Sequence, residues 1–341
     1  MEALSLATLL KSFRTHRLAE LIHAGAQQAL VSVDFDKPVV SRVTIGLEEN
    51  RKSIRIDEKP ISSRAKFPYL GGSLTFSPDD LILIKGGPEE RREFLDDLSL
   101  ALDPLYASCL QKYQKILKQR NALLKRLKEG KALFEELPLW TESLIEAAIP
   151  IYQERLKVIG ILQETLPSIY QLLFGVSEKL GLRYEHRLAR EFTSDPQEIE
   201  SLLIDKLNIL AEAERATGYS LAGPHKDDLE FTINGMIART FASQGQTRGL
   251  VIALKVGQLE LSRSIRKMSP ILLLDDIISE LDDTRVRALV NYLSNYSGQM
   301  FVTTAEVSKV KALHSQFSGF QIFDLDPFKA PQKGPQSLAL S

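Results

Sequence analysis

Hydrophobic and polar residues alternate with a period of two over residues 29–56. Successive side chains of a β-strand point to opposite faces of a sheet, so this alternation predicts half-buried antiparallel strands. Glu49 and Asn50 interrupt the alternation and predict a turn. The alternating hydrophobic residues are Val31, Val33 and Phe35, then Val43, Ile45 and Leu47, then Ile54 and Ile56.

The hydrophobic period becomes that of an α-helix after Pro88. Hydrophobic residues then recur every three or four positions, and Asp103 with Pro104 forms a helix start signal. We therefore expect helices to dominate as far as about Ala216. The positions that carry this pattern are Phe94, Leu95, Leu98 and Ala101, then Leu110, Tyr113, Ile116, Leu117, Leu123, Leu124 and Leu127.

A strand pattern returns after the helices. Leu229, Phe231 and Ile233 alternate with polar residues up to Asn234-Gly235, a dipeptide that favours the positive φ angles of a tight hairpin. Residues 272–274 are all leucine, as in a central strand covered on both faces, and residues 299–303 predict its neighbour.

The order of these elements predicts a mixed α/β core whose two halves come from the two ends of the chain. A helical lobe is inserted between them. We expect a first core segment at residues 1–85, the helical lobe at residues 86–215, a second core segment at residues 216–327 and a flexible tail at residues 328–341.

Composition narrows the classes of function. The 341 residues include one cysteine, Cys109, so no internal disulfide framework exists and a reducing cytoplasm is expected. Since no apolar run approaches the ~20 residues of a spanning helix, we expect no membrane insertion. The net charge of -1 means that any nucleic-acid site must be a local basic patch. Basic runs lie at residues 115–128 and 263–267, although such runs are usually solvated helix faces.

Two carboxylates, Asp275 and Asp276, follow the apolar run of residues 271–274. A buried strand delivers its last side chains to the carboxyl edge of a sheet, where α/β proteins bind ligands. Asp275 is then placed to hold Mg²⁺ and Asp276 to orient an attacking water. The alternative is that the pair simply ends a strand.

A second candidate segment, Ser243-Gln244-Gly245-Gln246, stands at the start of a helical pattern. Free backbone N–H groups and the positive end of the helix dipole suit a phosphate there. Taken alone, Ser243 is better explained as a plain N-cap. A third segment, Ser279-Glu280-Leu281-Asp282, follows the two carboxylates, and the three segments together strengthen the prediction of a phosphate site.

The order of these segments resembles the ATPase heads of the ABC and SMC class, and the helical insertion is too short for a long coiled-coil arm. Within that class the chain is similar to the RecF family from about Met1 to Asp326. Each matching segment is weak alone, and Gly223–Leu229 would also suit a plain turn with solvated charges. The matching segments are Lys11-Ser12-Phe13-Arg14-Thr15, Pro78-Asp79-Asp80-Leu81, Gly87-Pro88 with Arg91-Arg92-Glu93-Phe94-Leu95-Asp96, and Gly223-Pro224-His225-Lys226-Asp227-Asp228-Leu229.

RecF-like proteins begin with strands and the loop Gly-x-x-Gly-x-Gly-Lys-Thr, whose backbone and lysine bind phosphates. No such loop occurs in this sequence, and Met1–Leu4 resembles the middle of the helix that follows it. Two explanations compete: a gene start placed too far downstream, or a shortened protein that does not hydrolyse ATP. We favour the first, because Asp275, Asp276 and the Ser243 segment are intact.

The resemblance implies an ATP-dependent homodimer in which each subunit's Ser243, Gly245 and Gln246 contact the γ-phosphate bound by the other. It implies that Asp275 holds Mg²⁺, that Asp276 positions water and that Asp282 lies at the dimer seam. Thr304 falls near the position of a γ-phosphate sensor in related ATPases.

The implied function is a DNA-binding clamp in recombinational repair of gaps, in DNA replication and in the SOS response, with RecR and RecO as partners. The DNA would be single-stranded or double-stranded at gaps, and the contacts would be to phosphates. The alternative is a non-hydrolysing scaffold of the same family, while an ABC transporter ATPase fits the Arg91-Arg92-Glu93-Phe94 segment poorly. The expected DNA contacts are Arg91, Arg92, Lys115, Lys118, Arg120, Lys125 and Arg126.

Overall fold

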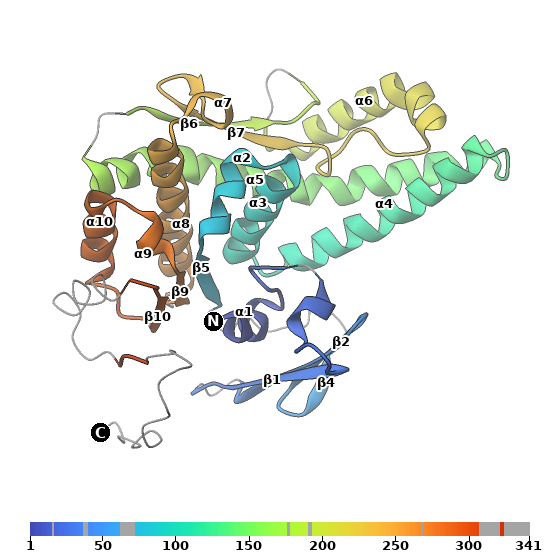
Figure 1. The fold of residues 1–341 in the computed structure, drawn as a ribbon. Helices are drawn as coiled ribbons and strands as arrows, with labels where there is room; N and C mark the ends of the chain where they lie inside the picture. The colour runs from blue at the N-terminus through green and yellow to red at the C-terminus, as the bar shows by residue number, and fades with distance from the viewer. Residues whose placement is uncertain are drawn as a thin grey trace.

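The computed structural model describes residues 1–15, 17–36, 40–61, 72–175, 178–189, 193–267, 269–306 and 321–323 (Figure 1). The strands form three sheets, and a group of long helices extends to one side of them. The predicted tail at residues 328–341 lies outside the described residues.

The first sheet is antiparallel, with the order β1-β2-β3-β4. The strands predicted within residues 29–56 are confirmed, and so is the turn at Glu49 and Asn50. Helix α1 (Glu2–Leu9) packs against β1 and β2 and shares with them a hydrophobic core of its own. The strands are β1 (Gln28–Asp34), β2 (Arg42–Glu48), β3 (Arg51–Ile56) and β4 (Lys59–Ile61).

The second sheet is parallel and joins the two ends of the chain. Its order is β10-β9-β5, from β5 (Ser73–Phe76), β9 (Ile271–Asp275) and β10 (Met300–Thr303). The predicted central strand at residues 272–274 is confirmed, because its three leucines are buried between two neighbours. The sequence did not predict β5.

The helices between these strands form an elongated bundle. Helix α5 runs for 38 residues, about 57 Å at the rise of an α-helix, despite Pro150 and Pro167 in its interior. Its first turn packs in a small core at the tip of the bundle with Leu123 and Leu124, and Trp140 packs against that core. The long helices are α3 (Pro88–Leu102), α4 (Tyr106–Lys128), α5 (Leu137–Phe174) and α6 (Pro196–Thr217).

The third sheet contains a strand where only helices were expected. Strand β6 (Leu180–Glu185) pairs with β7 (Asp228–Ile233), which turns at Asn234 and Gly235 into β8 (Met236–Ile237). Both turn residues have positive φ, 52° and 79°, which confirms the predicted hairpin. The largest hydrophobic core unites the helices with strands of the second and third sheets, and the boundaries at residues 85 and 215 remain a prediction.

Short helices and one further long helix complete the described fold. Helix α8 contacts α5, α3 and β5, and α10 contacts the end of α5 (Figure 1). No helix among the described residues has the length and apolar content needed to cross a bilayer. The remaining elements are η1 (Leu18–Leu21), η3 (Pro78–Leu81), α2 (Ile82–Lys85), η4 (Phe134–Glu136), α7 (Ala238–Phe241), α8 (Gln244–Arg266), α9 (Ile277–Glu280) and α10 (Asp283–Leu293).

Two of the arginines expected to contact DNA are buried in ion pairs, one between α3 and β7 and the other inside the helical bundle. Arg91 is 3% exposed and donates to both carboxylate oxygens of Asp228, at 2.6 and 2.9 Å. Arg120 is 2% exposed and donates to Glu214 at 2.6 Å. Their prediction as DNA contacts is wrong, because a buried, paired guanidinium cannot reach a phosphate without breaking the fold.

The Gly223–Leu229 segment is fixed by a buried polar network. Arg155 donates to the carbonyl oxygen of Pro224 at 2.7 Å and to Asp96 at 2.8 Å. Tyr184 donates to Asp227 at 2.6 Å. The segment is therefore anchored from α3, α5 and β6.

Two titratable groups of this segment have shifted pKa values, and the two shifts change the stability of the fold in opposite directions as the pH falls. Burial lowers the pKa of His225 to about 4, and burial raises the pKa of Asp227 to about 6. His225 stabilises the fold above its unfolded pKa of 6.5, and that contribution is lost as the pH falls. Asp227 acts in the opposite sense: its contribution is present below its unfolded pKa of 3.8 and is lost as the pH rises through about 6.

Asp227→Asn should therefore make the fold more sensitive to acid. The amide keeps an acceptor for Tyr184 but removes the titration that opposes His225. Between pH 7 and pH 5 the free energy of unfolding should fall by on the order of 1 kcal/mol more than in the wild type. Urea unfolding at several pH values measures this, with the exposed Asp205→Asn as control. Parallel profiles for all three proteins would contradict the assignment.

Candidate nucleotide site

The carboxyl edge of the parallel sheet brings together two strand ends. β9 ends at Asp275 and its neighbour β10 at Thr303. The Thr303 hydroxyl donates to Oδ1 of Asp275 at 2.7 Å.

Asp276 has a left-handed backbone, with φ 50° and ψ 13°. This conformation disfavours side chains with a Cβ and recurs at functional sites, where the surrounding structure has to hold it. Two interactions do so: Ser279 Oγ donates to Asp276 Oδ1 at 2.5 Å, and the Asp276 N–H donates to Thr303 Oγ1 at 3.1 Å. Thr304, expected as a phosphate sensor, lies 3.1 Å from Ser279 Oγ and thus belongs to the same cluster.

Ser243 and Gln246 form a capping box at the start of α8. Ser243 Oγ accepts from the Gln246 N–H at 3.2 Å, and Gln246 Oε1 accepts from the Ser243 N–H at 2.9 Å. Gln246 Nε2 donates in turn to Glu178 at 2.7 Å. The Gln246 side chain is thus engaged at both ends by residues of its own chain.

Gly245 lies under the guanidinium of Arg285. A Cβ at residue 245 would stand 3.3 Å from Arg285 Nη2, which is tighter than an ordinary contact. Arg285 also pairs with Asp282, the N-cap of α10, whose carboxylate accepts from the backbone N–H groups of Thr284 and Arg285. These hydrogen bonds, with the ion pair, lower the pKa of Asp282.

The residues present fit a nucleotide with Mg²⁺ only in part. Among the described residues, no group of three or more His, Cys, Asp or Glu could hold a metal by itself. Mg²⁺ in phosphate-binding sites takes one or two carboxylates together with phosphate oxygens and waters, and Asp275 fits that role. No phosphate-binding lysine loop accompanies it in the sequence.

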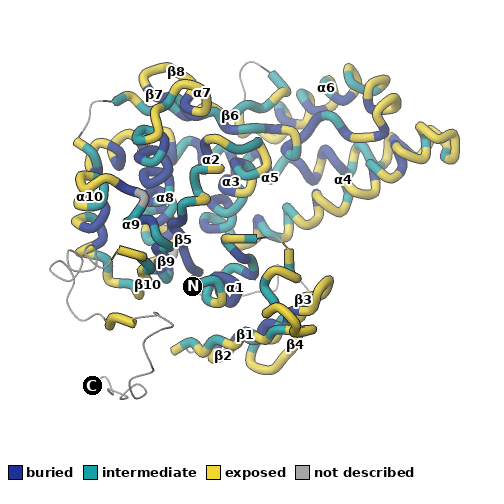
Figure 2. The backbone as a smooth tube through the Cα atoms, in the orientation of Figure 1, coloured by how far each residue is buried: buried dark blue, intermediate teal, exposed yellow. Residues whose placement is uncertain are grey.

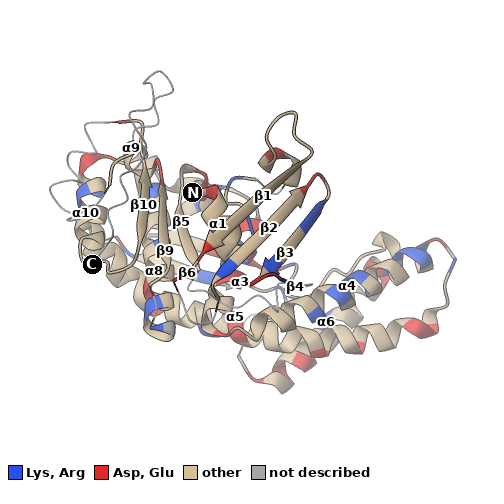
Figure 3. Cartoon of the chain, turned by 90° about the horizontal axis from the view of Figure 1, so that it is seen from below, with Lys and Arg blue, Asp and Glu red and all other residues tan. Residues whose placement is uncertain are grey.

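The remaining predicted DNA contacts lie on the outside of α4, apart from Arg92. Lys115, Lys118, Lys125 and Arg126 are exposed, and α4 contains no Asp or Glu (Figures 2 and 3). Arg92 is half-buried and donates to the carbonyl oxygen of Asp227 at 2.8 Å.

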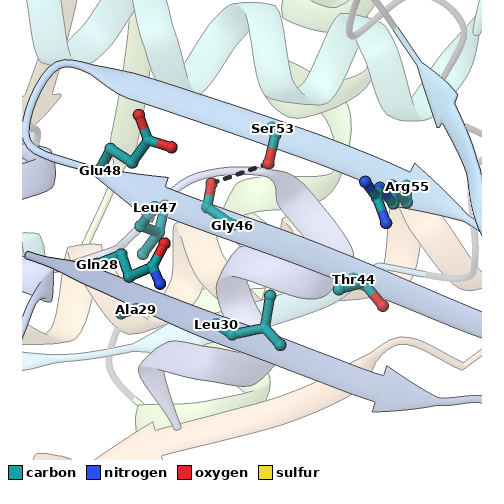
Figure 4. A pocket seen from close by; sticks show the side chains of 9 residues that line it. All are labelled: Gln28, Ala29, Leu30, Thr44, Gly46, Leu47, Glu48, Ser53 and Arg55. Carbon is teal, nitrogen blue, oxygen red and sulfur yellow. Dashed lines mark hydrogen bonds between the residues drawn. The ribbon is translucent and has the colours of Figure 1, made fainter.

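A surface groove of about 470 Å³ lies elsewhere, on the outer face of the antiparallel sheet (Figure 4). It is lined by residues of β1, β2 and β3, with Glu48 and Arg55 as its charged groups. Ser53 donates to the carbonyl oxygen of Gly46 across it. Since none of the predicted site residues lines this groove, it does not change the assignment.

Sequence reasoning missed Thr303, Glu178 and Arg285. Arg285 follows Asp282 at i+3 on a helix, a spacing that predicts a side-chain contact. Glu178 and Thr303 approach their partners through the tertiary fold and leave no such local signal.

No protein-family model matches the chain. In contrast, curated relatives named DNA replication and repair protein RecF match most of its length. That of Geobacter sp. strain M21 is 36% identical over 313 residues, which cover 91% of this chain and 84% of the relative. That of Cyanothece sp. strain PCC 7425 is 34% identical over 310 residues, which cover 89% and 81%.

Solved structures agree with these relatives. A structure of the recombination mediator protein RecF-ATP in the RecFOR pathway superposes with a TM-score of 0.79 at 29% identity, and the match covers 90% of this chain and 82% of that one. A second, of RecF-ATPrS, gives 0.77 at 28% identity over the same shares. The predicted α/β fold of an ABC and SMC-type ATPase head with an inserted helical lobe is confirmed.

Replacements of Asp276 should separate its backbone role from its charge. Asn tolerates the left-handed conformation and still accepts from Ser279, so Asp276→Asn should leave the free energy of unfolding unchanged within ~0.5 kcal/mol. Asp276→Ala should cost about 1 kcal/mol, because it loses that hydrogen bond and tolerates the conformation poorly. Urea unfolding measures both. Equal stability of the Ala and Asn variants would show that the turn is not strained.

Proposed function

This chain belongs to the RecF family of DNA replication and repair proteins, and we propose that it acts as an ATP-dependent DNA-binding clamp in the repair of gaps. The observation that carries the proposal is the pair Asp275 and Asp276 at the carboxyl edge of a parallel sheet, held by Thr303 and Ser279. The RecF-ATP structure, which shares this fold, supports ATP as the nucleotide.

In the proposed mechanism, two subunits enclose ATP and each contributes different parts to a site. Asp275 would hold Mg²⁺, and Asp276 would position the attacking water. Ser243, Gly245 and Gln246 would contact the γ-phosphate bound by the other subunit, because the positive end of the α8 dipole suits a phosphate. Asp282 would lie at the seam, and Thr304 would sense the phosphate from beside Ser279.

The proposed DNA path follows α4. Lys115, Lys118 and Lys125 are spaced by three and seven residues, so they share one face of the helix. Phosphate contacts of this kind confer affinity without sequence readout. Arg126 flanks this face, and Arg92 lies at the root of the bundle.

By analogy with the RecFOR pathway, the partners would be RecR, RecO and gapped DNA, single-stranded or double-stranded, with roles in recombination, replication and the SOS response. A cytoplasmic location would accord with these roles. The alternative is a non-hydrolysing scaffold of the same family.

Nucleotide-dependent self-association distinguishes the proposed ATP-dependent clamp from the non-hydrolysing scaffold. Sedimentation of the 341-residue chain and of a version extended by the upstream codons of its gene should show, for at least one of the two, dimers with ATP and Mg²⁺ but monomers with ADP. Asp276→Asn in the associating version should slow hydrolysis and prolong the dimer. Ser243→Arg should abolish association by blocking the phosphate position. Monomers under all conditions in both versions would favour the scaffold.

Charge reversal on α4 tests the DNA path. Lys115→Glu, Lys118→Glu and Lys125→Glu together should weaken DNA binding by at least ~10-fold and reduce the salt slope by about 1 for each DNA phosphate that α4 no longer neutralises. Fluorescence anisotropy across a salt series measures both quantities. The matched control reverses Arg51, Arg55 and Lys59, exposed residues of the antiparallel sheet, with the same change in net charge. Equal effects in both triple variants would point to net charge rather than to α4.

A further inference from the structure

Arg285 touches three segments that are distant in sequence. It pairs with Asp282 at the start of α10, and its side chain is only 25% exposed. Its Nη2 lies 3.3 Å from the position of a Cβ at Gly245, in the first turn of α8. Its guanidinium carbon lies 5.6 Å from the centre of the Phe174 ring, at the end of α5.

Electrostatics alone does not account for this placement. The start of a helix carries a partial positive charge, so a guanidinium beside the first turn of α8 is repelled by the helix dipole. Asp282 offsets that repulsion through the ion pair. The Nε atom of Arg285 is buried and has no hydrogen-bond partner among the described residues. The contact to Gly245 is therefore one of packing, whereas the guanidinium lies over the Phe174 ring in a cation–π contact.

The end of α5 meets α8 at further points nearby. A Cβ at Gly249 would stand 3.3 Å from Tyr170 and 3.4 Å from Phe174, so the absence of a side chain there lets α5 approach closely. Tyr170 donates to Glu178 at 2.5 Å, and Glu178 accepts from Gln246. The first turns of α8 are thus joined to α5 on two sides.

We propose that Arg285 is a positioning residue that ties the start of α8, the Asp282 turn and the end of α5 into one unit. Displacement of either Gly245 or Asp282 then moves Phe174, and α5 carries the displacement to the far end of the bundle, where it packs against α4. The tie itself is a property of the single subunit. Its use in coupling nucleotide to DNA rests on the proposed function.

Hydrogen exchange of the free protein tests the tie without nucleotide. In Arg285→Ala, the amides of residues 247–249, 284–286 and 173–175 should all exchange about fivefold faster or more, because the shared guanidinium no longer holds the three segments together. Arg285→Lys keeps a cation for Asp282 but lacks the planar group that packs on Gly245 and Phe174, so it should not restore slow exchange at 247–249 and 173–175.

The matched control is Arg287→Ala, which removes an exposed arginine of the same helix with one long hydrogen bond of 3.5 Å to Thr284. It should leave residues 247–249 and 173–175 unchanged. If Arg285→Ala speeds exchange only at 284–286, or if Arg285→Lys restores all three segments, Arg285 is a local ion-pair partner of Asp282 and the inference is wrong.

Sedimentation with ATP and Mg²⁺ then distinguishes this inference from the proposed function. If the wild type associates with nucleotide, Arg285→Ala should associate at least ~10-fold more weakly, while Arg287→Ala should match the wild type. Unchanged association of Arg285→Ala would overturn the coupling. If the wild type does not associate, the proposed function fails while faster exchange in all three segments still establishes the tie.

Discussion

The parallel pairing of β9 with β5 is the constraint on which the rest of the structure depends. It places Ile271 beside Ser73, so the helical bundle between them has to leave and return to the same sheet. Because all three strands run in one direction, their carboxyl ends share an edge, and Asp275 meets Thr303 there. The topology of the parallel sheet is therefore what brings the residues of the candidate site together at this edge.

Local sequence patterns predicted several strands and one hairpin. Strands β1, β2 and β3 followed from alternation, the central strand β9 from its run of leucines and the hairpin at Asn234 from turn chemistry. β6 was missed because its residues, Leu180–Glu185, form a short run between two long helices, and its pairing with β7 spans the whole of α6. Such nonlocal pairing is not recorded in a local pattern.

The candidate site likewise contains residues that the sequence predicted and residues that it did not. The residue types and their order predicted Asp275, Asp276 and Ser243, because each stands at the end of a strand or the start of a helix. A run of basic residues is less informative, since it does not reveal which side chains are solvated. Arg120 faces Glu214 in the interior of the bundle, while Lys118, two positions earlier, is exposed. Removing one partner of such a buried pair would leave an uncompensated charge, so Arg120 has a structural reason to be present that is independent of DNA.

Residues of the Ser243–Gln246 segment are already engaged with other parts of their own chain. Both ends of the Gln246 amide are bonded, to Ser243 and to Glu178, and the space above Gly245 holds Arg285. A phosphate that approaches the start of α8 therefore has to compete with these interactions before it can make new ones. Whatever affinity it has for the rearranged site is reduced by the free energy of breaking them. Two of these interactions connect to the end of α5, through Glu178 to Tyr170 and through Arg285 to Phe174. Breaking them would therefore disturb α5, and the helical bundle is the part of the molecule that would respond first.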